Sequence, residues 1–113
     1  MATARYVQTG DAIDYTPSSD VSAGDVVVQG ELVGVAKLDI AADALGALAV
    51  TGVFDFPKAT GEGEAIDAGA EVYWDVADGV AKEDDETGAN KLIGKTVAAA
   101  GDDDATVRVR MSQ

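Results

Sequence analysis

Glycine, proline and aspartate interrupt this 113-residue chain so often that no segment is long enough for a stable helix. The apolar residues between the interruptions follow the period of a strand. In residues 105–111, Val107 and Val109 fall on one face while Arg108 and Arg110 fall on the other. Such alternation is typical of a strand with one buried face. Many short strands and closely spaced turns predict an all-β domain, either a small β-barrel or a β-sandwich-like domain, with at most one short helical turn.

The same pattern predicts where the individual strands lie. Gly34 inside one strand indicates a bulge or a close backbone approach. Residues 41–46 are predicted to form a turn or a single helical turn, and Asp78–Gly79 marks a hairpin. We expect strands at residues 12–16, 26–28, 32–40, 47–56, 71–75, 90–100 and 105–111.

The chain length fits a single folded unit. We expect a flexible N-terminal arm over residues 1–10 and one β-rich domain over residues 11–113, because free termini are usually poorly ordered. The arm contains Arg5 and Tyr6. Both residue types are enriched at protein interfaces, so the arm is a candidate to bind a partner.

The composition excludes most catalytic chemistry. The chain has no histidine and no cysteine, so Ser-His-Asp and Cys-His arrangements, disulfides and Cys-ligated zinc cannot form. Residues 61–64 are glycine-rich but lack the lysine of a phosphate-binding loop. The acidic runs at 83–86 and 102–104 are interpreted as solvated loops, because consecutive carboxylates splay apart instead of surrounding a cation. We therefore expect no catalytic residue, no cofactor and no bound metal.

The charge of the chain limits its partners. Its 21 acidic and 8 basic residues give a formal net charge of −13, which repels nucleic-acid backbones and anionic membranes. The acidity favours solubility, and adaptation to a saline environment remains an alternative explanation. No segment has the apolar length of a membrane span, and the first residues lack the pattern of a signal peptide. We expect the protein to be made and used inside a cell, or inside a particle assembled there.

Two sets of side chains are candidate partner contacts within the domain. Tyr73 and Trp74 are neighbours in a predicted strand, so they face opposite sides, one toward the core and one toward solvent or an interface. Arg108 and Arg110 share a strand face, where each can pair with a carboxylate of a partner or of this chain. With Arg5 and Tyr6, these four residues form the predicted contact set.

Several segments together resemble a known family, the capsid cement (head decoration) proteins of tailed bacteriophages and prophages. The resemblance extends from about Tyr6 to Met111. Its most characteristic pieces are the strand Val72-Tyr73-Trp74-Asp75 and the segment Leu92-Ile93-Gly94-Lys95. The other segments are 23–28, 32–36, 46–59, 68–71 and 107–111.

This resemblance implies a small β-rich domain with no catalytic residues. It implies binding to the outside of an assembled shell, with the major capsid protein as partner, as a homo-oligomer in which a trimer is favoured and a dimer is possible. The location it implies is the virion head surface, after synthesis in a bacterial or archaeal host cytoplasm.

Two other readings remain open at this point. A small-ligand or carbohydrate-binding β module needs an aromatic-lined cleft, and aromatic residues make up only 5% of the chain. An enzyme that uses only carboxylates, a lysine or a tyrosine needs a deep pocket with buried acidic groups.

Overall fold

The computed structural model describes residues 3–6 and 8–113, and it confirms a mainly β fold. Among these residues, nine strands and one short 3-10 helical turn form. The strands are β1 (Ala12–Tyr15), β2 (Val26–Gln29), β3 (Leu32–Ala36), β4 (Gly46–Ala49), β5 (Gly52–Pro57), β6 (Glu71–Asp75), β7 (Val80–Lys82), β8 (Lys91–Thr96) and β9 (Thr106–Met111), and the helical turn is η1 (Glu86–Gly88).

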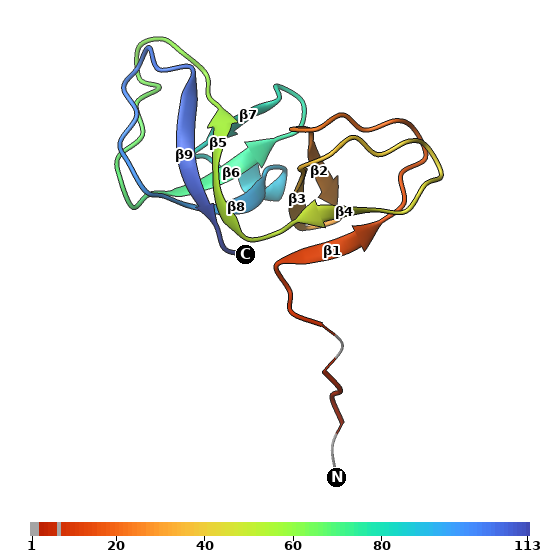
Figure 1. Cartoon of the computed structure of the whole chain (residues 1–113). Helices are drawn as coiled ribbons and strands as arrows, with labels where there is room; N and C mark the ends of the chain where they lie inside the picture. The colour runs from red at the N-terminus through yellow and green to blue at the C-terminus, as the bar shows by residue number, and fades with distance from the viewer. Residues whose placement is uncertain (1–2, 7) are drawn as a thin grey trace.

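The strands form two antiparallel sheets, which lie side by side in Figure 1. The N-terminal half supplies a four-stranded sheet in the order β1-β4-β3-β2. The C-terminal half supplies a five-stranded sheet in the order β5-β9-β8-β6-β7. The two sheets do not close into a barrel, so the arrangement is nearer to the sandwich-like alternative.

The main hydrophobic core lies between the two sheets. Val33 and Val35 of β3 contribute from the four-stranded sheet, while the five-stranded sheet contributes the larger side chains. The aromatic rings of Phe56 and Trp74 pack at a centroid distance of 6.0 Å. From β9, Val107 and Val109 point into this core, as the alternation of that strand predicts.

A second, smaller core lies on the other face of the four-stranded sheet. It contains the buried side chains of Ala36, Ile40 and Leu48. A Cβ atom added to Gly34 would lie 2.8 Å from the Cβ of Leu48, which is closer than two carbon atoms can pack. The predicted close approach at Gly34 is therefore confirmed, and it brings β3 and β4 together.

The prediction of one strand over residues 47–56 is wrong. The segment forms β4 and β5, which belong to different sheets. The chain changes sheet at Val50–Gly52, where the amide of Val50 donates to the carbonyl of Asp11 and Gly52 has φ +113°. Apolar alternation continues through this crossing, so the sequence pattern does not reveal it.

Two other strands are shorter in the structure than predicted. The strand expected over 32–40 ends at Ala36, and the one expected over 90–100 ends at Thr96. Residues 41–46 contain no helical turn, whereas the acidic segment after Lys82 contains η1. The predicted hairpin is confirmed, with Asp75 opposite Val80 in the β6–β7 register.

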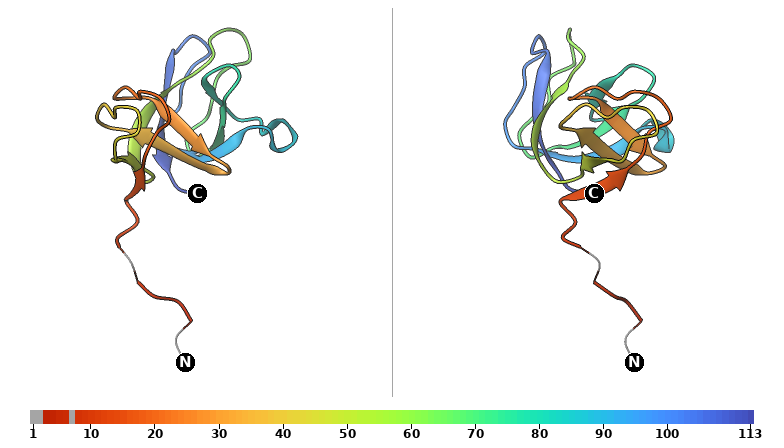
Figure 2. Two further views of the ribbon diagram at one scale, coloured as in Figure 1. Left: turned by 90° about the vertical axis from the view of Figure 1, so that its right-hand side faces the viewer. Right: turned by 45° about the vertical axis from the view of Figure 1, so that its right-hand side comes forward.

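Residues 1, 2 and 7 of the expected N-terminal arm lie outside the described residues. The described residues before β1 form no strand, and Figures 1 and 2 show the chain there leading away from both sheets. The Tyr6 hydroxyl lies 3.1 Å from the Thr9 hydroxyl.

Candidate interaction surface

The outer face of the five-stranded sheet carries a row of side chains that crosses four strands. Arg110 on β9 lies directly opposite Lys95 on β8. On its other side Arg110 is opposite Val53 of β5, and Lys95 is opposite Glu71 of β6. Antiparallel pairing places directly opposed residues on the same face, so the row is continuous. Lys95 and Arg110, with the half-exposed Val53 and Val97 near them, are called the outer patch below.

Among the residues that the structure describes, the two cations of the outer patch have no carboxylate partner. Within residues 3–6 and 8–113, neither Lys95 nor Arg110 takes part in an ion pair. By contrast, Lys82, Lys91 and Arg108 each pair with carboxylates of this chain. The outer patch is therefore a locally positive site on a strongly acidic surface.

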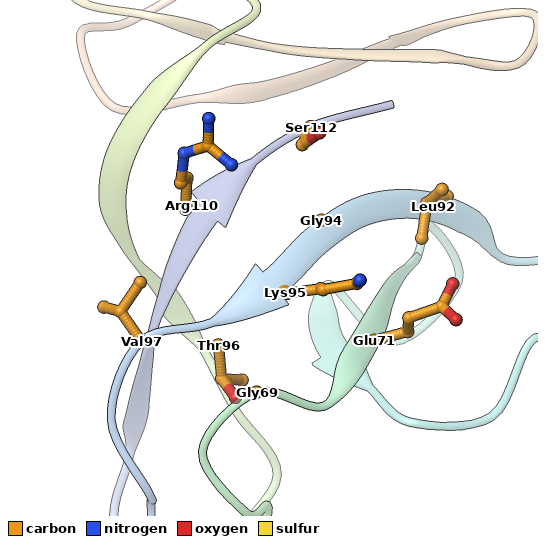
Figure 3. Close-up of a pocket in the computed structure, with 9 residues that line it drawn as sticks. All are labelled: Gly69, Glu71, Leu92, Gly94, Lys95, Thr96, Val97, Arg110 and Ser112. Atoms are coloured by element: carbon orange, nitrogen blue, oxygen red, sulfur yellow. The ribbon is translucent and has the colours of Figure 1, made fainter.

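A hollow of about 380 Å³ adjoins these cations. It lies over the β6–β8–β9 part of the sheet. Figure 3 shows Lys95 and Arg110 rising from neighbouring strands, with their side chains diverging from each other. The residues that line the hollow are Gly69, Glu71, Leu92, Gly94, Lys95, Thr96, Val97, Arg110 and Ser112.

Arg108 is on the same face as Arg110 but is differently engaged. Its guanidinium donates two hydrogen bonds to Asp55 on β5, with Nε–Oδ1 at 2.9 Å and the second at 3.3 Å. These hydrogen bonds lower the pKa of Asp55 and raise that of Arg108. Arg108 therefore pairs within the chain. Arg110 forms no ion pair with a described residue, so its guanidinium is available to a partner.

The adjacent aromatic residues Tyr73 and Trp74 are separated by the sheet. Trp74 is 8% exposed and belongs to the main core. Tyr73 lies on the outer face, half-buried, opposite Leu92 and Lys82. Of this pair, Tyr73 is the residue placed to meet a partner, whereas the Trp74 ring is taken up by packing.

Arg5 and Tyr6 are far from the outer patch along the chain and remain exposed. The Tyr6 side chain is 79% exposed. The structure therefore does not gather the six predicted contact residues at one place: Arg108, Arg110 and Tyr73 share the outer face of one sheet, Arg5 and Tyr6 precede β1, and Trp74 is in the core.

Sequence reasoning missed Lys95, Val53 and Val97. A row that crosses several strands depends on which strands are neighbours and in what register, and this information is not local. The sequence could have indicated one of them, because Lys95 lies within a mainly apolar predicted strand and its charge favours an outward-facing position. A bulge at Val72/Tyr73 also shifts the register of β6 against β8.

The most buried ion pair is a structural feature of the β6–β7 hairpin. Asp75 is 4% exposed and lies 2.9 Å from the Nζ of Lys82. It also accepts a hydrogen bond from the amide of Asp78. The Lys82 hydrogen bond is the main cause that lowers the pKa of Asp75. This carboxylate stabilises a turn, and the arrangement does not resemble a paired acid and base.

No group of metal-ligating side chains converges among the described residues. Over the same part of the chain, no helix has the length and apolar content needed to cross a bilayer. The lining of the hollow includes no aromatic side chain, so it lacks the stacking surface expected of a sugar-binding cleft.

Comparison with known proteins places the chain in a family. The family described as phage cement protein matches residues 7–111, a range that contains all nine strands. No curated protein and no solved structure matches the chain.

Proposed function

Because the chain belongs to the phage cement protein family, we propose that it binds the outer surface of the assembled phage head and stabilises contacts between major capsid subunits. The chain is a structural cement protein of a phage. The observation that supports the finer proposal is the family match over both sheets, which the resemblance described above independently anticipates. In this proposal the protein acts on the head surface, and it performs no chemical reaction and uses no cofactor.

Such stabilisation arises because binding of the protein is linked to assembly of the shell. A protein that binds the assembled shell but not the dissociated subunits stabilises the shell in proportion to the logarithm of its concentration over Kd. At a concentration of ~100 times Kd this amounts to about 2.7 kcal/mol per site. A homo-oligomer, with a trimer favoured and a dimer possible, would add avidity, so the contact of each subunit can be weak.

We propose that the contacts come from two parts of the chain. One is the segment before β1, with Arg5 and Tyr6, which we treat as an arm over residues 1–10 attached to a single domain over 11–113. The other is the outer face of the five-stranded sheet, with Tyr73, Arg108 and Arg110. All of these side chains are at least partly exposed, and Tyr and Arg supply large contact areas at interfaces.

The test is co-sedimentation with expanded heads of the phage or prophage that encodes the chain. Heads that lack the protein should bind it to saturation, and the decorated heads should lose their contents at a higher temperature than the bare ones. An unrelated protein of similar size and negative charge serves as the control. If the cognate heads bind no more protein than this control, the proposal is wrong.

A further inference from the structure

We propose that the outer patch binds an acidic segment of the major capsid protein, with carboxylates of that segment meeting Lys95 and Arg110. This inference rests on the proposed function, since it assigns the chemistry of one contact on the shell. In this proposal the outer patch determines which segment is bound, whereas the rest of the outer face only has to fit the capsid surface.

The first support is the distribution of charge. The chain has 21 acidic residues and only 8 basic ones, so a cation on its surface has many internal carboxylates available. Lys82, Lys91 and Arg108 use them. Lys95 and Arg110 do not pair within the described part of the chain. The exposed Lys37 does not pair there either, so the missing ion pairs distinguish the outer patch only together with the opposed placement of its two cations. Glu71 is opposite Lys95 in register, yet no ion pair joins the two side chains.

The second support is the placement of the two cations directly opposite each other on adjacent strands. Like charges in directly opposed positions destabilise a sheet. Glu71 is the carboxylate in register with Lys95, but among the described residues no carboxylate forms an ion pair with either cation, so the repulsion is only partly offset. An external carboxylate would offset it, so bound anionic groups are favoured more at this pair than at an isolated surface lysine.

The third support is the shape of the site. The two side chains point in different directions beside the hollow (Figure 3). A segment of chain with more than one carboxylate fits this arrangement, because each cation can then meet a carboxylate of its own. Val53 and Val97, which are 54% and 47% exposed, provide apolar surface beside the charges that such a segment can cover.

These features favour a protein segment over nucleic acid. A duplex carries a charge every ~1.7 Å along its axis, and a body with a net charge of −13 repels such a polymer on every side of the patch. A protein segment can present a few carboxylates locally without that continuous charge. The patch is also not complementary to itself, because a symmetric dimer through it would bring the cations of two copies together.

The experiment compares three single charge reversals, Lys95→Glu, Arg110→Glu and Lys37→Glu, in the full-length chain. Lys37 is exposed, forms no ion pair with a described residue and lies outside the five-stranded sheet, so it is a control for the change in net charge. Binding to bare cognate heads is measured by co-sedimentation at several salt concentrations. We expect Lys95→Glu and Arg110→Glu to raise Kd at least tenfold, and Lys37→Glu to change it less than twofold.

A folding defect is excluded by thermal unfolding. Arg110→Glu replaces one of two opposed like charges by an opposite charge, so this variant should unfold at the wild-type temperature or above it. Lys95→Glu gains an opposite charge in Arg110 but places a carboxylate opposite Glu71, so Lys95→Gln, which adds no carboxylate, is included as the variant that keeps the fold at this position. Suppressors of Arg110→Glu selected in the phage should replace Asp or Glu by Lys in the major capsid protein.

Three other outcomes of the binding experiment would each contradict this inference. If wild-type protein binds heads and both patch variants bind equally well, this inference is wrong while the proposed function stands. If the patch variants change the oligomeric state of the free protein and leave its affinity for heads unchanged, the patch joins copies of this chain and the inference is again wrong. If wild-type protein binds no heads, the proposed function fails and this inference fails with it.

Discussion

The side-chain amide of Gln113 pairs with the backbone of Val33 in both directions. Its Oε1 accepts from the Val33 amide at 2.7 Å, and its Nε2 donates to the Val33 carbonyl at 2.8 Å. Val33 lies in β3 of the four-stranded sheet, while Gln113 follows β9 of the five-stranded sheet. This residue therefore acts as a short strand partner that joins the two sheets near the end of β9 (Figure 1).

The first prediction concerns this link. Gln113→Ala should lower the free energy of unfolding by about 1–3 kcal/mol, because it leaves the amide of the fully buried Val33 without a partner. Gln113→Glu should destabilise the fold as well, since a carboxylate cannot donate to the Val33 carbonyl. Urea unfolding measures both. Gln29→Ala, an exposed position, is the control, and equal stability of all three variants would contradict the link.

The second prediction concerns the buried Lys58. Its side chain is 5% exposed, and its Nζ donates to the carbonyls of Ala59, Asp102 and Asp104 at 2.7, 3.4 and 3.2 Å. Lys58→Met should destabilise the protein by about 1–3 kcal/mol, because these carbonyls lose a charged donor.

Hydrogen exchange should show the effect of Lys58→Met concentrated at the turn of residues 101–104. The control is Lys37→Met, which removes an exposed lysine and should have little effect. Unchanged protection of the 101–104 amides in Lys58→Met would show that the ammonium does not hold this turn.

The third prediction concerns Gly94, beside the hollow. An added Cβ at this position would collide with the carbonyl oxygen of Arg110 and lie 2.8 Å from the amide nitrogen of Ser112. Backbone cannot move aside as a flexible side chain can, so Gly94→Ala should cost about 1–3 kcal/mol of stability. Gly101→Ala, where the nearest atom is 3.7 Å from the added Cβ, should cost much less. Thermal unfolding of the two variants compares them directly.

The fourth prediction is a pH dependence at the β6–β7 hairpin. Hydrogen bonds from Lys82 and from the Asp78 amide hold the pKa of Asp75 below its usual value. A carboxyl group with a lowered pKa in the folded state stabilises that state above its unfolded pKa, and this contribution is lost as pH falls through the folded pKa. Lys82 has a raised pKa, so its contribution is lost only in strongly alkaline solution.

Asp75→Asn isolates this effect. The difference in unfolding free energy between wild type and Asp75→Asn should be constant near neutral pH and shrink below about pH 4, near the unfolded pKa of aspartate. The exposed Asp103→Asn variant is the control. A difference that stays constant down to pH 2 would contradict a role for the ionised Asp75.

Parts of the fold were predictable because they depend on neighbours in sequence. The alternation in β9 correctly places Val107 and Val109 inside and Arg108 and Arg110 outside. The hairpin at Asp78–Gly79 also follows from local turn preferences. The division of residues 47–56 between two sheets was not predictable, since the turn at Val50–Gly52 leaves the apolar alternation intact.

The candidate contacts show the same limit. Arg110 was identified from its position on one face of a predicted strand. That Lys95 lies beside it follows only from the register of β8 against β9. The pairing of Arg108 with Asp55 likewise joins residues from β9 and β5 that are 53 positions apart. A pair of tyrosine and tryptophan on one strand indicates that one side chain is buried, but which one depends on the sheet that covers it.

The amino-acid sequence alone determined the all-β class, the strongly acidic charge and the lack of histidine and cysteine, because these are properties of composition and of local spacing. The tertiary structure alone decided that Lys95 and Arg110 stand side by side without an ion pair to any described residue, and that Gln113 reaches Val33. Both arrangements arise from strand order and register. These are set by packing between residues distant in sequence, where a shift of one position would turn every side chain to the opposite face.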